Sequence, residues 1–305
     1  MKVNSFNKLI QVAKETSCKR IAVVMAEESS VLKAVERARK EGMVEAILFG
    51  KEEEIRKVAI KAEISLQNYE IVNVLSPQKA AYKSVRFARE GKFDMIMKGN
   101  IKTADLFKTV LDKDTGLRIG RTLNVVSLFE IPGYNRLIMA AGGAIIINPT
   151  LKQKVDMINN CVEVTDSLGW ENPLTAIIAG IEVVNPKMPA TVEAAILSKM
   201  YDRGQIKGTV VDGPFAIDNA ISVEAARIKH ISSPVAGKAD ILIMPNIEVG
   251  NIFYKTLVFL GGARVAPTVA GAAVPIVITS RADTEDTRLY SIALSSIYAE
   301  KRRGY

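Results

Sequence analysis

The sequence predicts an α/β protein with two lobes, each built on a mostly parallel sheet whose two faces are covered by helices. Short apolar or β-branched runs alternate with helical patterns along almost the whole chain, which is typical of strand-helix-strand units. These runs contain few polar residues, as expected of strands buried on both faces. The chain of 305 residues is too long for one ordinary core and long enough for two.

The first half of the chain alternates regularly between strand and helix signals. Its apolar runs have the composition of buried strands, and the segments between them carry charged residues at helical spacing. After an amphipathic N-terminal helix, the expected elements are strands over 21–26, 46–50, 93–99, 124–131 and 137–147, and helices over 29–42, 51–63 and 103–113.

The second half continues the same alternation. Thr150 precedes a helical pattern and has the residue type of an N-cap, so a helix is expected to begin at Leu151. The later expected elements are strands over 175–184, 208–215, 239–246 and 274–280, a helix over 191–204 and a long C-terminal helix after the last strand.

The expected domain boundary lies near Asn148-Pro149-Thr150, where a strand ends and a helix begins. The second lobe then runs to about Ala270, and the last strand and helix return to the first lobe. The predicted division is a discontinuous domain of residues 1–148 and 271–305, and an inserted domain of residues 149–270. A cleft between two such lobes is a common place for ligands.

The formal net charge of +8 indicates an anionic partner. Lysines and arginines are spread along the chain beside acids, and no basic run is interleaved with aromatic residues. This pattern speaks against nucleic acid and against an anionic membrane surface as partners. It favours phosphate groups on a small ligand.

The composition also indicates a reducing compartment, which we expect to be the cytoplasm. The sequence has no apolar run of the roughly 18 residues needed to cross a membrane, and its start lacks the apolar core of a signal peptide. Its two cysteines give no disulfide framework, and its one histidine gives no obvious zinc set, so no metal is expected.

Polar residues follow several expected strands, at the edge where open α/β sheets bind their ligands. The first cluster contains Lys98, Gly99, Asn100 and Thr103. Glycine lets the backbone approach a ligand, and the N-terminus of a helix capped by Thr103 favours anions. A plain turn with a helix cap explains the same residues.

Two further clusters lie in the expected inserted domain. Asp212 and Asp218 flank the turn Gly213-Pro214, where the acids could bind a metal, orient a base, or serve as turn and N-cap residues. Gly250 and Asn251 have the pattern of a helix-start anion site, with Lys255 about one turn further on.

The fourth cluster is the stretch VITSRADTEDTRLY, at a junction of strand and helix. Ser280 is positioned to cap the following helix, with Asp283 as the reciprocal member of a weak capping box. Capping does not require Arg281, whose charge is unfavourable at a helix N-terminus unless an anion binds there. A hydroxyl, backbone N–H groups and a guanidinium together make a phosphate cradle. Asp286 lies about one helical turn beyond it.

Together these clusters resemble the phosphate acetyl/butyryltransferase family. The motifs that carry the resemblance are MKGNIKTADLFKTVL, VVSLFEIPGY, INPTLKQKVDMI, VDGPFAIDNAIS, SPVAGKADILIMPNIEVGNIFYK and ITSRAD, in the family's order from about residue 20 to residue 300. The segments SLFEIPGY and TSRAD are more similar to the butyryl branch than to the acetyl branch.

The resemblance implies reversible transfer of a short-chain acyl group between coenzyme A and phosphate, with coenzyme A as a substrate and no bound cofactor. It implies a two-lobed fold like that of isocitrate and isopropylmalate dehydrogenases, in a homodimer or larger homo-oligomer. By position, the catalytic serine-arginine pair of the family falls on Ser280 and Arg281. The catalytic aspartate aligns with Thr287, so Asp286, one residue earlier, is the chosen candidate and Asp283 the reserve.

Two departures from the family pattern leave other functions open. Gly142 stands where members commonly have aspartate, and Asn246 follows Pro245 where many have aspartate. One alternative is a non-catalytic paralogue that binds acyl-CoA. Another is an enzyme that uses acyl carrier protein in place of coenzyme A.

Overall fold

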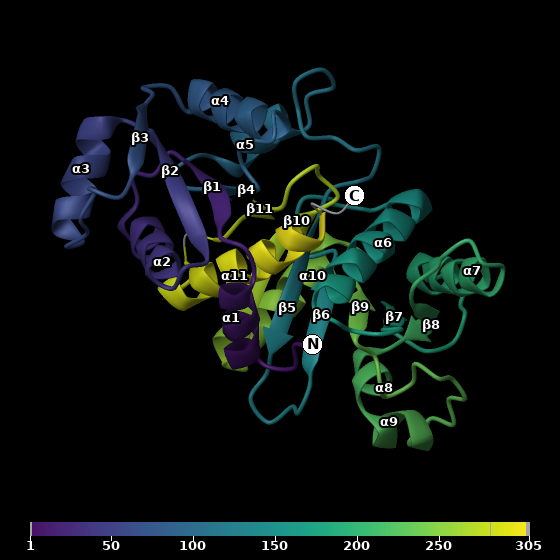
Figure 1. The fold of residues 1–305 in the computed structure, drawn as a ribbon. Coiled ribbons are helices and arrows are strands. Elements are labelled where there is room, and N and C mark those ends of the chain that lie inside the picture. Colours follow the sequence, from purple (N-terminus) through teal and green to yellow (C-terminus); the bar gives the residue numbers. More distant parts are fainter. Residues whose placement is uncertain (1, 281, 303–305) are drawn as a thin grey trace. The chain divides into compact units, whose positions relative to one another are not determined.

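The computed structural model describes residues 2–280 and 282–302 and confirms the α/β fold class (Figure 1). The chain divides into two compact units. We call residues Phe6–Arg121 with Ala266–Tyr305 the terminal unit, and Met1–Ser5 with Thr122–Val265 the inserted unit.

The terminal unit has strands in the order β3-β2-β1-β4-β11-β10, all parallel to their neighbours except β10 against β11. Helices α4 and α5 cover one face of the strands, and α1, α2 and α11 cover the other (Figure 1). Its elements are α1 (Phe6–Glu15), β1 (Lys19–Val24), α2 (Ser29–Lys40), β2 (Val44–Gly50), α3 (Glu52–Lys61), β3 (Glu70–Asn73), α4 (Pro77–Arg89), β4 (Met95–Lys98), α5 (Thr103–Val110), β10 (Arg264–Ala270), β11 (Ile276–Val277) and α11 (Glu285–Arg302).

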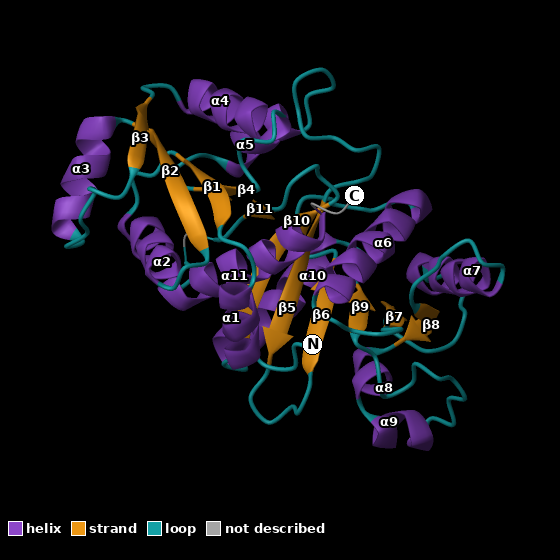
Figure 2. Cartoon of the chain, viewed as in Figure 1, coloured by secondary structure: helices purple, strands orange, loops and turns teal. Residues whose placement is uncertain are grey.

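The inserted unit has strands in the order β5-β6-β9-β7-β8, parallel except for the pair β5 and β6. Figure 2 shows its strands in orange with helices around them. Its elements are β5 (Asn124–Glu130), β6 (Leu137–Ala141), α6 (Leu151–Ser167), β7 (Leu174–Ile178), α7 (Pro189–Asp202), β8 (Val210–Phe215), α8 (Ile217–Ile221), α9 (Val223–Ile228), β9 (Ile241–Ile243), α10 (Ile247–Lys255) and the π-helix η1 (Thr256–Leu260).

One apolar core of the inserted unit shows how strand alternation places its helices. Phe129, Ala176 and Leu242, from three strands, are buried on one face together with Phe215. Helix α10 and η1 pack onto this face through residues that include Phe253. Successive strand residues point to opposite faces, so the remaining apolar positions are available to α6 and α7.

The expected elements agree closely with the observed ones for the first strands. Two later strands end earlier than expected, and some elements were not predicted. The strand expected over 137–147 ends at Ala141, because Gly142 has a φ of +104° and turns the chain. The strand expected over 175–184 ends at Ile178, and the following valines are exposed. Strands β3 and β10 and helix α4 were not predicted.

The compact units divide the chain at 121/122 and 265/266, whereas the domains expected from the sequence divide at 148/149 and 270/271. The difference arises because β5 and β6 pair with each other, and β6 pairs with β9 of the inserted unit. Residues 1–5 belong there too, since Trp170 Nε1 donates to the carbonyl of Val3 at 2.8 Å. The expected domain boundaries stay a prediction.

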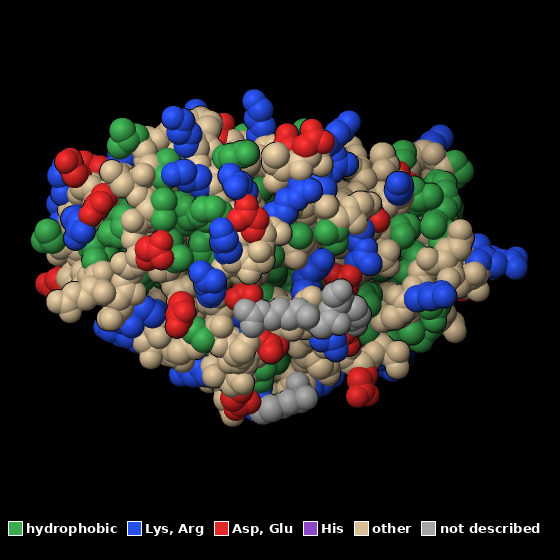
Figure 3. Space-filling view, turned by 45° about the horizontal axis from the view of Figure 1, so that its top comes forward, with side chains coloured by type: hydrophobic (Ala, Val, Ile, Leu, Met, Phe, Trp, Pro, Cys, Tyr) green, Lys and Arg blue, Asp and Glu red, His purple; other side chains and the backbone are tan. Residues whose placement is uncertain are grey.

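The lysine and arginine side chains are spread among acidic ones on the face shown in Figure 3. Many of the exposed charges form pairs within one helix, such as Arg56 with Glu52 at 2.6 Å. In the described part of the chain, no helix is both long enough and apolar enough to cross a membrane.

Candidate functional site

Three neighbouring strands of the terminal unit bring the predicted residues of that unit to one edge. Strands β1, β4 and β11 are adjacent and parallel, so their carboxyl ends lie together. Residues 25–28 follow β1, Gly99 and Asn100 follow β4, and Ser280 follows β11. This is the edge at which open α/β sheets hold ligands.

Gly99 allows two of these connections to approach each other closely. A Cβ on Gly99 would lie 2.7 Å from the carbonyl oxygen of Val24 and closer still to that of Met25. The Asn100 amide donates to the Met25 carbonyl at 2.6 Å. The glycine is therefore explained by backbone packing, and it leaves Asn100 exposed at the strand end.

The predicted role of Thr103 as the N-cap of α5 was wrong, although the helix begins at this residue. Thr103 is the first residue of α5, and Lys102 occupies the N-cap position without a side-chain hydrogen bond. The Lys98 ammonium donates to the carbonyl of Gly99 at 3.3 Å. Helix α5 thus begins with its first N–H groups uncapped by a side chain, beside an exposed Thr103.

Ser280 begins a tight turn that carries the fourth cluster. Its backbone N–H donates to Asp283 Oδ2 at 2.6 Å, and the Asp283 N–H donates to the Ser280 carbonyl at 3.1 Å. Ala282 N–H donates to Ser280 Oγ at 3.4 Å. Ser280 is exposed, while Arg281 lies outside the described residues.

Ser280 does not cap α11, contrary to the sequence expectation. The helix begins at Glu285, and the hydroxyl oxygen of Thr284 accepts the N–H of Thr287 at 3.1 Å. Thr284 is the N-cap, because its side chain reaches the third helical N–H. Ser280 and residues 282–284 therefore lie before the helix and are not part of it.

Arg288 holds this turn from the inside, and the sequence reading missed it. The side chain is 1% exposed and donates to the carbonyls of Ser280 and Thr284, each at 3.3 Å, and to the carbonyl of Asp283. It also donates to Glu28 Oε1 at 2.9 Å. The available signal was its spacing, since Arg288 lies four residues before the buried Ile292 and shares its helix face.

Asp286 lies in the first turn of α11 and is paired with α2. Arg37 Nη1 donates to Asp286 Oδ1 at 2.6 Å, and Glu285 lies 3.8 Å from the same guanidinium nitrogen. The Asp286 carboxylate, more than any other neighbour, raises the pKa of Arg37. The Asp286 side chain is 57% exposed, so solvent and ligands reach it.

In the inserted unit, Asp212, Gly213 and Pro214 lie on β8, towards its carboxyl end. Asp212 Oδ1 accepts the N–H of Gly213 at 2.8 Å, as a turn-type residue does. Asp218 does not join Asp212 but pairs with Lys229 at 3.1 Å. The structure therefore supports the interpretation of Asp212 and Asp218 as local structural residues.

The predicted helix-start site at Gly250 and Asn251 was misplaced. Helix α10 begins at Ile247, and the Asn246 side chain caps it by accepting the Val249 N–H at 3.0 Å. Asparagine caps as well as aspartate, so the departure at position 246 preserves the helix start. Lys255 ends the helix, with its ammonium 5.2 Å from the ring centroid of Tyr254.

Gly250 instead allows α10 to cross the turn after β6. A Cβ on Gly250 would lie 2.5 Å from Gly143 Cα, and Asn251 Nδ2 donates to the Gly143 carbonyl at 3.4 Å. Gly142 precedes this crossing in a conformation that side chains rarely adopt. The φ of +104° at Gly142 explains why glycine stands at this position.

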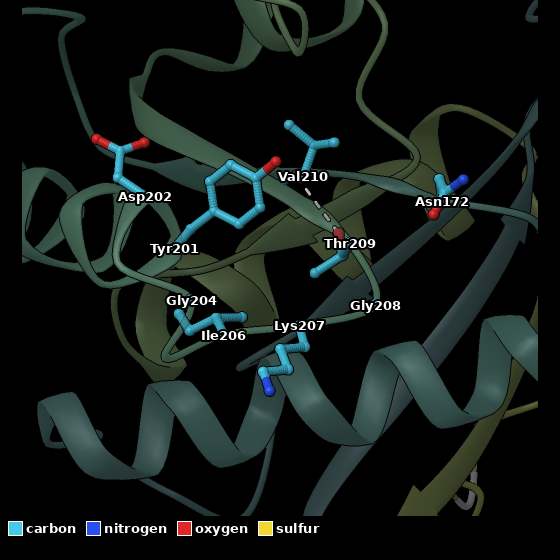
Figure 4. Close-up of a pocket in the computed structure, with 9 residues that line it drawn as sticks. All are labelled: Asn172, Tyr201, Asp202, Gly204, Ile206, Lys207, Gly208, Thr209 and Val210. Carbon is cyan, nitrogen blue, oxygen red and sulfur yellow. Dashed lines mark hydrogen bonds between the residues drawn. The ribbon is translucent and has the colours of Figure 1, made fainter.

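A pocket of about 610 Å³ lies at the other end of two strands of the inserted unit (Figure 4). It is lined by residues that precede β7 and β8 or end α7, among them Asn172, Tyr201, Asp202, Lys207 and Thr209. None of the predicted site residues lines it, and its position at the amino ends of the strands differs from that of the predicted site.

The cysteines show no sign of a nucleophile. Cys161 is buried in α6, and desolvation strongly raises the pKa of its thiol. Burial, more than any other cause, also raises the pKa of Cys18. A reactive cysteine requires the opposite shift. Among the residues that the structure describes, no group of three or more histidine, cysteine or acidic side chains could hold a metal ion.

Comparison with known proteins identifies the family. A family model described as "Phosphate acetyl/butaryl transferase" matches residues 5–88 and 75–296. The phosphate acetyltransferase of Thermotoga maritima is 51% identical over 96% of this chain and 99% of its own. The phosphate butyryltransferase of Clostridium acetobutylicum is 46% identical over 97% and 99%.

Solved structures agree with the fold. A branched-chain phosphotransacylase from Enterococcus faecalis V583 matches with a TM-score of 0.82 and 28% identity, over 92% of this chain and 99% of its own. A phosphotransacetylase from Streptococcus pyogenes matches with a TM-score of 0.81 and 22% identity, over 97% and 99%.

Proposed function

This chain belongs to the phosphate acetyl/butyryltransferase family, and from that premise we propose how its residues carry out acyl transfer to phosphate. The reaction is acyl-CoA plus phosphate giving acyl phosphate plus coenzyme A, and its reverse. The observation that carries the assignment of the site is the meeting of three strand ends, with Asn100 and the Ser280 turn, at one edge of the terminal unit.

Ser280 and Arg281 bind the phosphate. A guanidinium matches two phosphate oxygens at once, and charge-assisted hydrogen bonds of this kind are the strong ones. The Ser280 hydroxyl is exposed at the strand end, while its backbone N–H is already bound to Asp283. The hydroxyl and the guanidinium therefore supply the phosphate contacts, and they offset charge that develops on the phosphate during transfer.

Asp286 accepts the proton of the coenzyme A thiol, and Asp283 is the reserve candidate. In the direction of acyl-CoA synthesis, the sulfur must lose its proton to attack the acyl carbon, and a carboxylate can take it. Asp283 is engaged with the Ser280 amide, which makes it a structural member of the turn. Asp286 is the more exposed acid and becomes available when its pair with Arg37 opens.

Transfer is direct, from one bound substrate to the other. The sulfur–carbon bond forms as the bond between the acyl carbon and the phosphate oxygen breaks, and phosphate leaves with the electron pair. Holding both substrates in line supplies much of the rate enhancement. The buried Cys161 thiol, with its raised pKa, is not suited to carry the acyl group.

Lys98, Asn100 and Thr103 in the terminal unit, and Asp212, Gly213, Pro214, Gly250, Asn251 and Lys255 in the inserted unit, stay our candidates for substrate contacts. Exposure to solvent favours a binding role for Asn100 and Thr103, among others of these residues. Gly250 and Gly213 shape the backbone, since an added Cβ on either would clash.

The acyl group is short, and we propose that butyryl is transferred faster than acetyl. The segments SLFEIPGY and TSRAD support butyryl, and the 51% identity to an acetyltransferase supports acetyl as the second candidate. The experiment is release of free coenzyme A from butyryl-CoA and from acetyl-CoA, with and without phosphate. Phosphate-dependent release that is faster with butyryl-CoA is expected. Faster release from acetyl-CoA would show that acetyl is the preferred acyl group. Release at the same rate with and without phosphate would refute acyl transfer to phosphate.

We also propose a homo-oligomer. The helix formed by α10 and η1 exposes apolar side chains, with Ile252 66% and Leu260 85% exposed. Apolar side chains grouped in this way favour a protein partner. Light scattering should show a dimer or larger assembly, and Leu260→Glu should shift it towards monomer. A parent protein that is monomeric at micromolar concentration would contradict the proposal.

A further inference from the structure

We propose that Arg288 is a positioning residue, which fixes the backbone at Ser280, Asp283 and Thr284, the described residues around the Ser280–Arg281 pair, and thereby sets the affinity for phosphate. This inference rests on the proposed function of that pair. It concerns a side chain that contributes no group to the substrate.

The burial of Arg288 requires an explanation of its own. It is 1% exposed and is the largest of the fully buried side chains, in a helix whose other buried residues are mainly apolar or small. Burying a charged group is costly unless it is paired and hydrogen-bonded. A leucine or methionine would fill the same position at lower cost, so packing alone does not account for an arginine.

The acceptors of Arg288 identify what it does. Three are backbone carbonyls of one short turn, those of Ser280, Asp283 and Thr284, and they lie on both sides of position 281 in the sequence. The Thr284 carbonyl also accepts the Arg288 N–H at 3.2 Å, and the Ser280 carbonyl also accepts the Asp283 N–H at 3.1 Å, so the guanidinium adds a second donor to each. A carbonyl oxygen has two lone pairs and can accept both. A guanidinium has five donors in a rigid fork, which suits several acceptors at once.

The fourth acceptor connects the turn to a second strand end. Glu28 Oε1 accepts from Arg288 Nη2 at 2.9 Å and from Ser30 Oγ at 2.6 Å. Glu28 is the N-cap residue of α2, in the connection that follows β1. Arg288 therefore fixes the turn after β11 relative to the connection after β1, and both belong to the terminal unit.

This arrangement makes a graded prediction. Arg288→Met keeps the apolar stem and removes every donor, so the turn loses its fixed geometry. A displacement of about 1 Å in a positioning element can cost up to about 100-fold in rate. Arg288→Lys keeps the charge and fewer donors, and its effect should fall between Arg288→Met and the parent. Glu28→Gln removes the ion pair but keeps the contacts to the carbonyls, so its effect should be the smallest.

The matched control is Lys19→Met. Lys19 is also a fully buried cation, and it pairs with Glu300 of the same helix α11. It donates to the Ser17 carbonyl at 2.8 Å, and its partner Glu300 lies near the C-terminal end of α11, away from the turn. Lys19→Met should lower the melting temperature, as Arg288→Met should, but it should leave the geometry of the turn unchanged.

The test combines steady-state kinetics with hydrogen exchange on the intact protein. For Arg288→Met we expect KM for phosphate to rise by about tenfold or more while KM for acyl-CoA stays within about twofold. Lys19→Met should leave both within about twofold per folded molecule. Equal rises in both KM values, or an unchanged KM for phosphate in Arg288→Met, would overturn the proposal. If Arg288→Met does not fold, Arg288→Lys decides by the same criteria.

Hydrogen exchange separates this inference from the proposed function. Amides of residues 280–288 should exchange at least about tenfold faster in Arg288→Met than in the parent and in Lys19→Met. If the parent shows no phosphate-dependent transfer, the proposed function fails, yet this measurement still tests whether Arg288 orders the turn. Unchanged exchange would overturn the positioning role whatever the activity.

Discussion

Two strand-end turns, one in each unit, are held in different ways. In the terminal unit, the turn after β11 is held by Arg288, which also pairs with Glu28, and the first turn of the following helix is held by Arg37 with Asp286. In the inserted unit, the turn after β6 is held by direct backbone contact, with Gly143 against Gly250. The first kind of connection tolerates changes in side-chain volume but depends on charge. The second is insensitive to charge and intolerant of a single added carbon.

This difference matters for function because the phosphate site is assigned to the charged connection. The exposed pair of Arg37 with Asp286 can be rearranged at modest cost when a substrate binds, since exposed ion pairs contribute at most about 1 kcal/mol each. A glycine crossing cannot be rearranged without moving the backbone. We therefore expect substitutions at the turn after β11 to change catalysis first, and those at the crossing of Gly143 and Gly250 to change stability first.

The largest effect is expected at Arg281. Arg281→Ala removes the guanidinium that we propose binds phosphate, and turnover should fall by about 10³-fold, as when a group that stabilises transition-state charge is lost. Kinetics of coenzyme A release should show this, with an unchanged circular dichroism spectrum. Activity close to that of the parent would remove Arg281 from the site.

The choice of base is tested by a pair of matched substitutions. Asp286→Asn should lower turnover by about 100-fold, because the thiol loses its proton acceptor. Asp283→Asn keeps an oxygen that can accept the Ser280 N–H, so it should have the smaller effect. The reverse order would transfer the role of base to Asp283.

Gly250→Ala is expected to destabilise the inserted unit. The new Cβ would lie 2.5 Å from Gly143 Cα, so the backbone must shift, and the free energy of unfolding should fall by about 2 to 3 kcal/mol. Gly180→Ala is the control, since its Cβ meets only the flexible end of Met188 at 3.1 Å. Urea denaturation should separate the two variants, and equal stability would contradict the account of this crossing.

A smaller effect is expected from Arg37→Met. The variant frees both oxygens of Asp286, at the loss of an exposed ion pair worth at most about 1 kcal/mol. Turnover should rise by about two- to fivefold, the range that such a free energy allows. The control is Arg86→Met, which breaks an exposed pair with Glu90 on α4. A fall in turnover for Arg37→Met alone would show that the pair is part of the active arrangement.

The smallest expected effect is a pH-dependent loss of stability when Glu36 in the terminal unit is replaced. A hydrogen bond from Arg39, more than any other cause, lowers the pKa of Glu36 to about 2. A depressed pKa in the folded state stabilises the protein above the unfolded value, and this stabilisation is lost as pH falls through the folded value. Glu36→Gln should therefore cost about 1 kcal/mol at neutral pH and progressively less below about pH 4.5. A pH-independent difference in melting behaviour would contradict this assignment.

The fold could be predicted where one local signal dominates. Thr150, with the residue type of an N-cap, marked the start of α6, and the structure adds Gln153 as its partner in a capping box. The apolar run at β1 marked its strand. β3 was missed because residues 70–73 are at most half-buried, so the apolar signal is weak. β10 was missed because Pro267 interrupts its apolar run.

The candidate site could be predicted only as far as single segments allow. The sequence placed Ser280, Arg281 and Asp286 together because they are adjacent along the chain. It could not show that Arg37 binds Asp286, nor that Arg288 binds the turn, since these contacts depend on how α2 and α11 pack. It also misplaced the start of α10, because Asn246 was a stronger N-cap than the pattern at Gly250 indicated.

The central claim, direct acyl transfer between coenzyme A and phosphate, is tested most directly by isotope exchange. Labelled coenzyme A is incubated with unlabelled butyryl-CoA and the parent enzyme, with and without phosphate, and label in butyryl-CoA is followed. The account predicts exchange only when phosphate is present, because the acyl group can leave coenzyme A only for phosphate. Rapid exchange without phosphate would demonstrate an acyl-enzyme intermediate and contradict direct transfer.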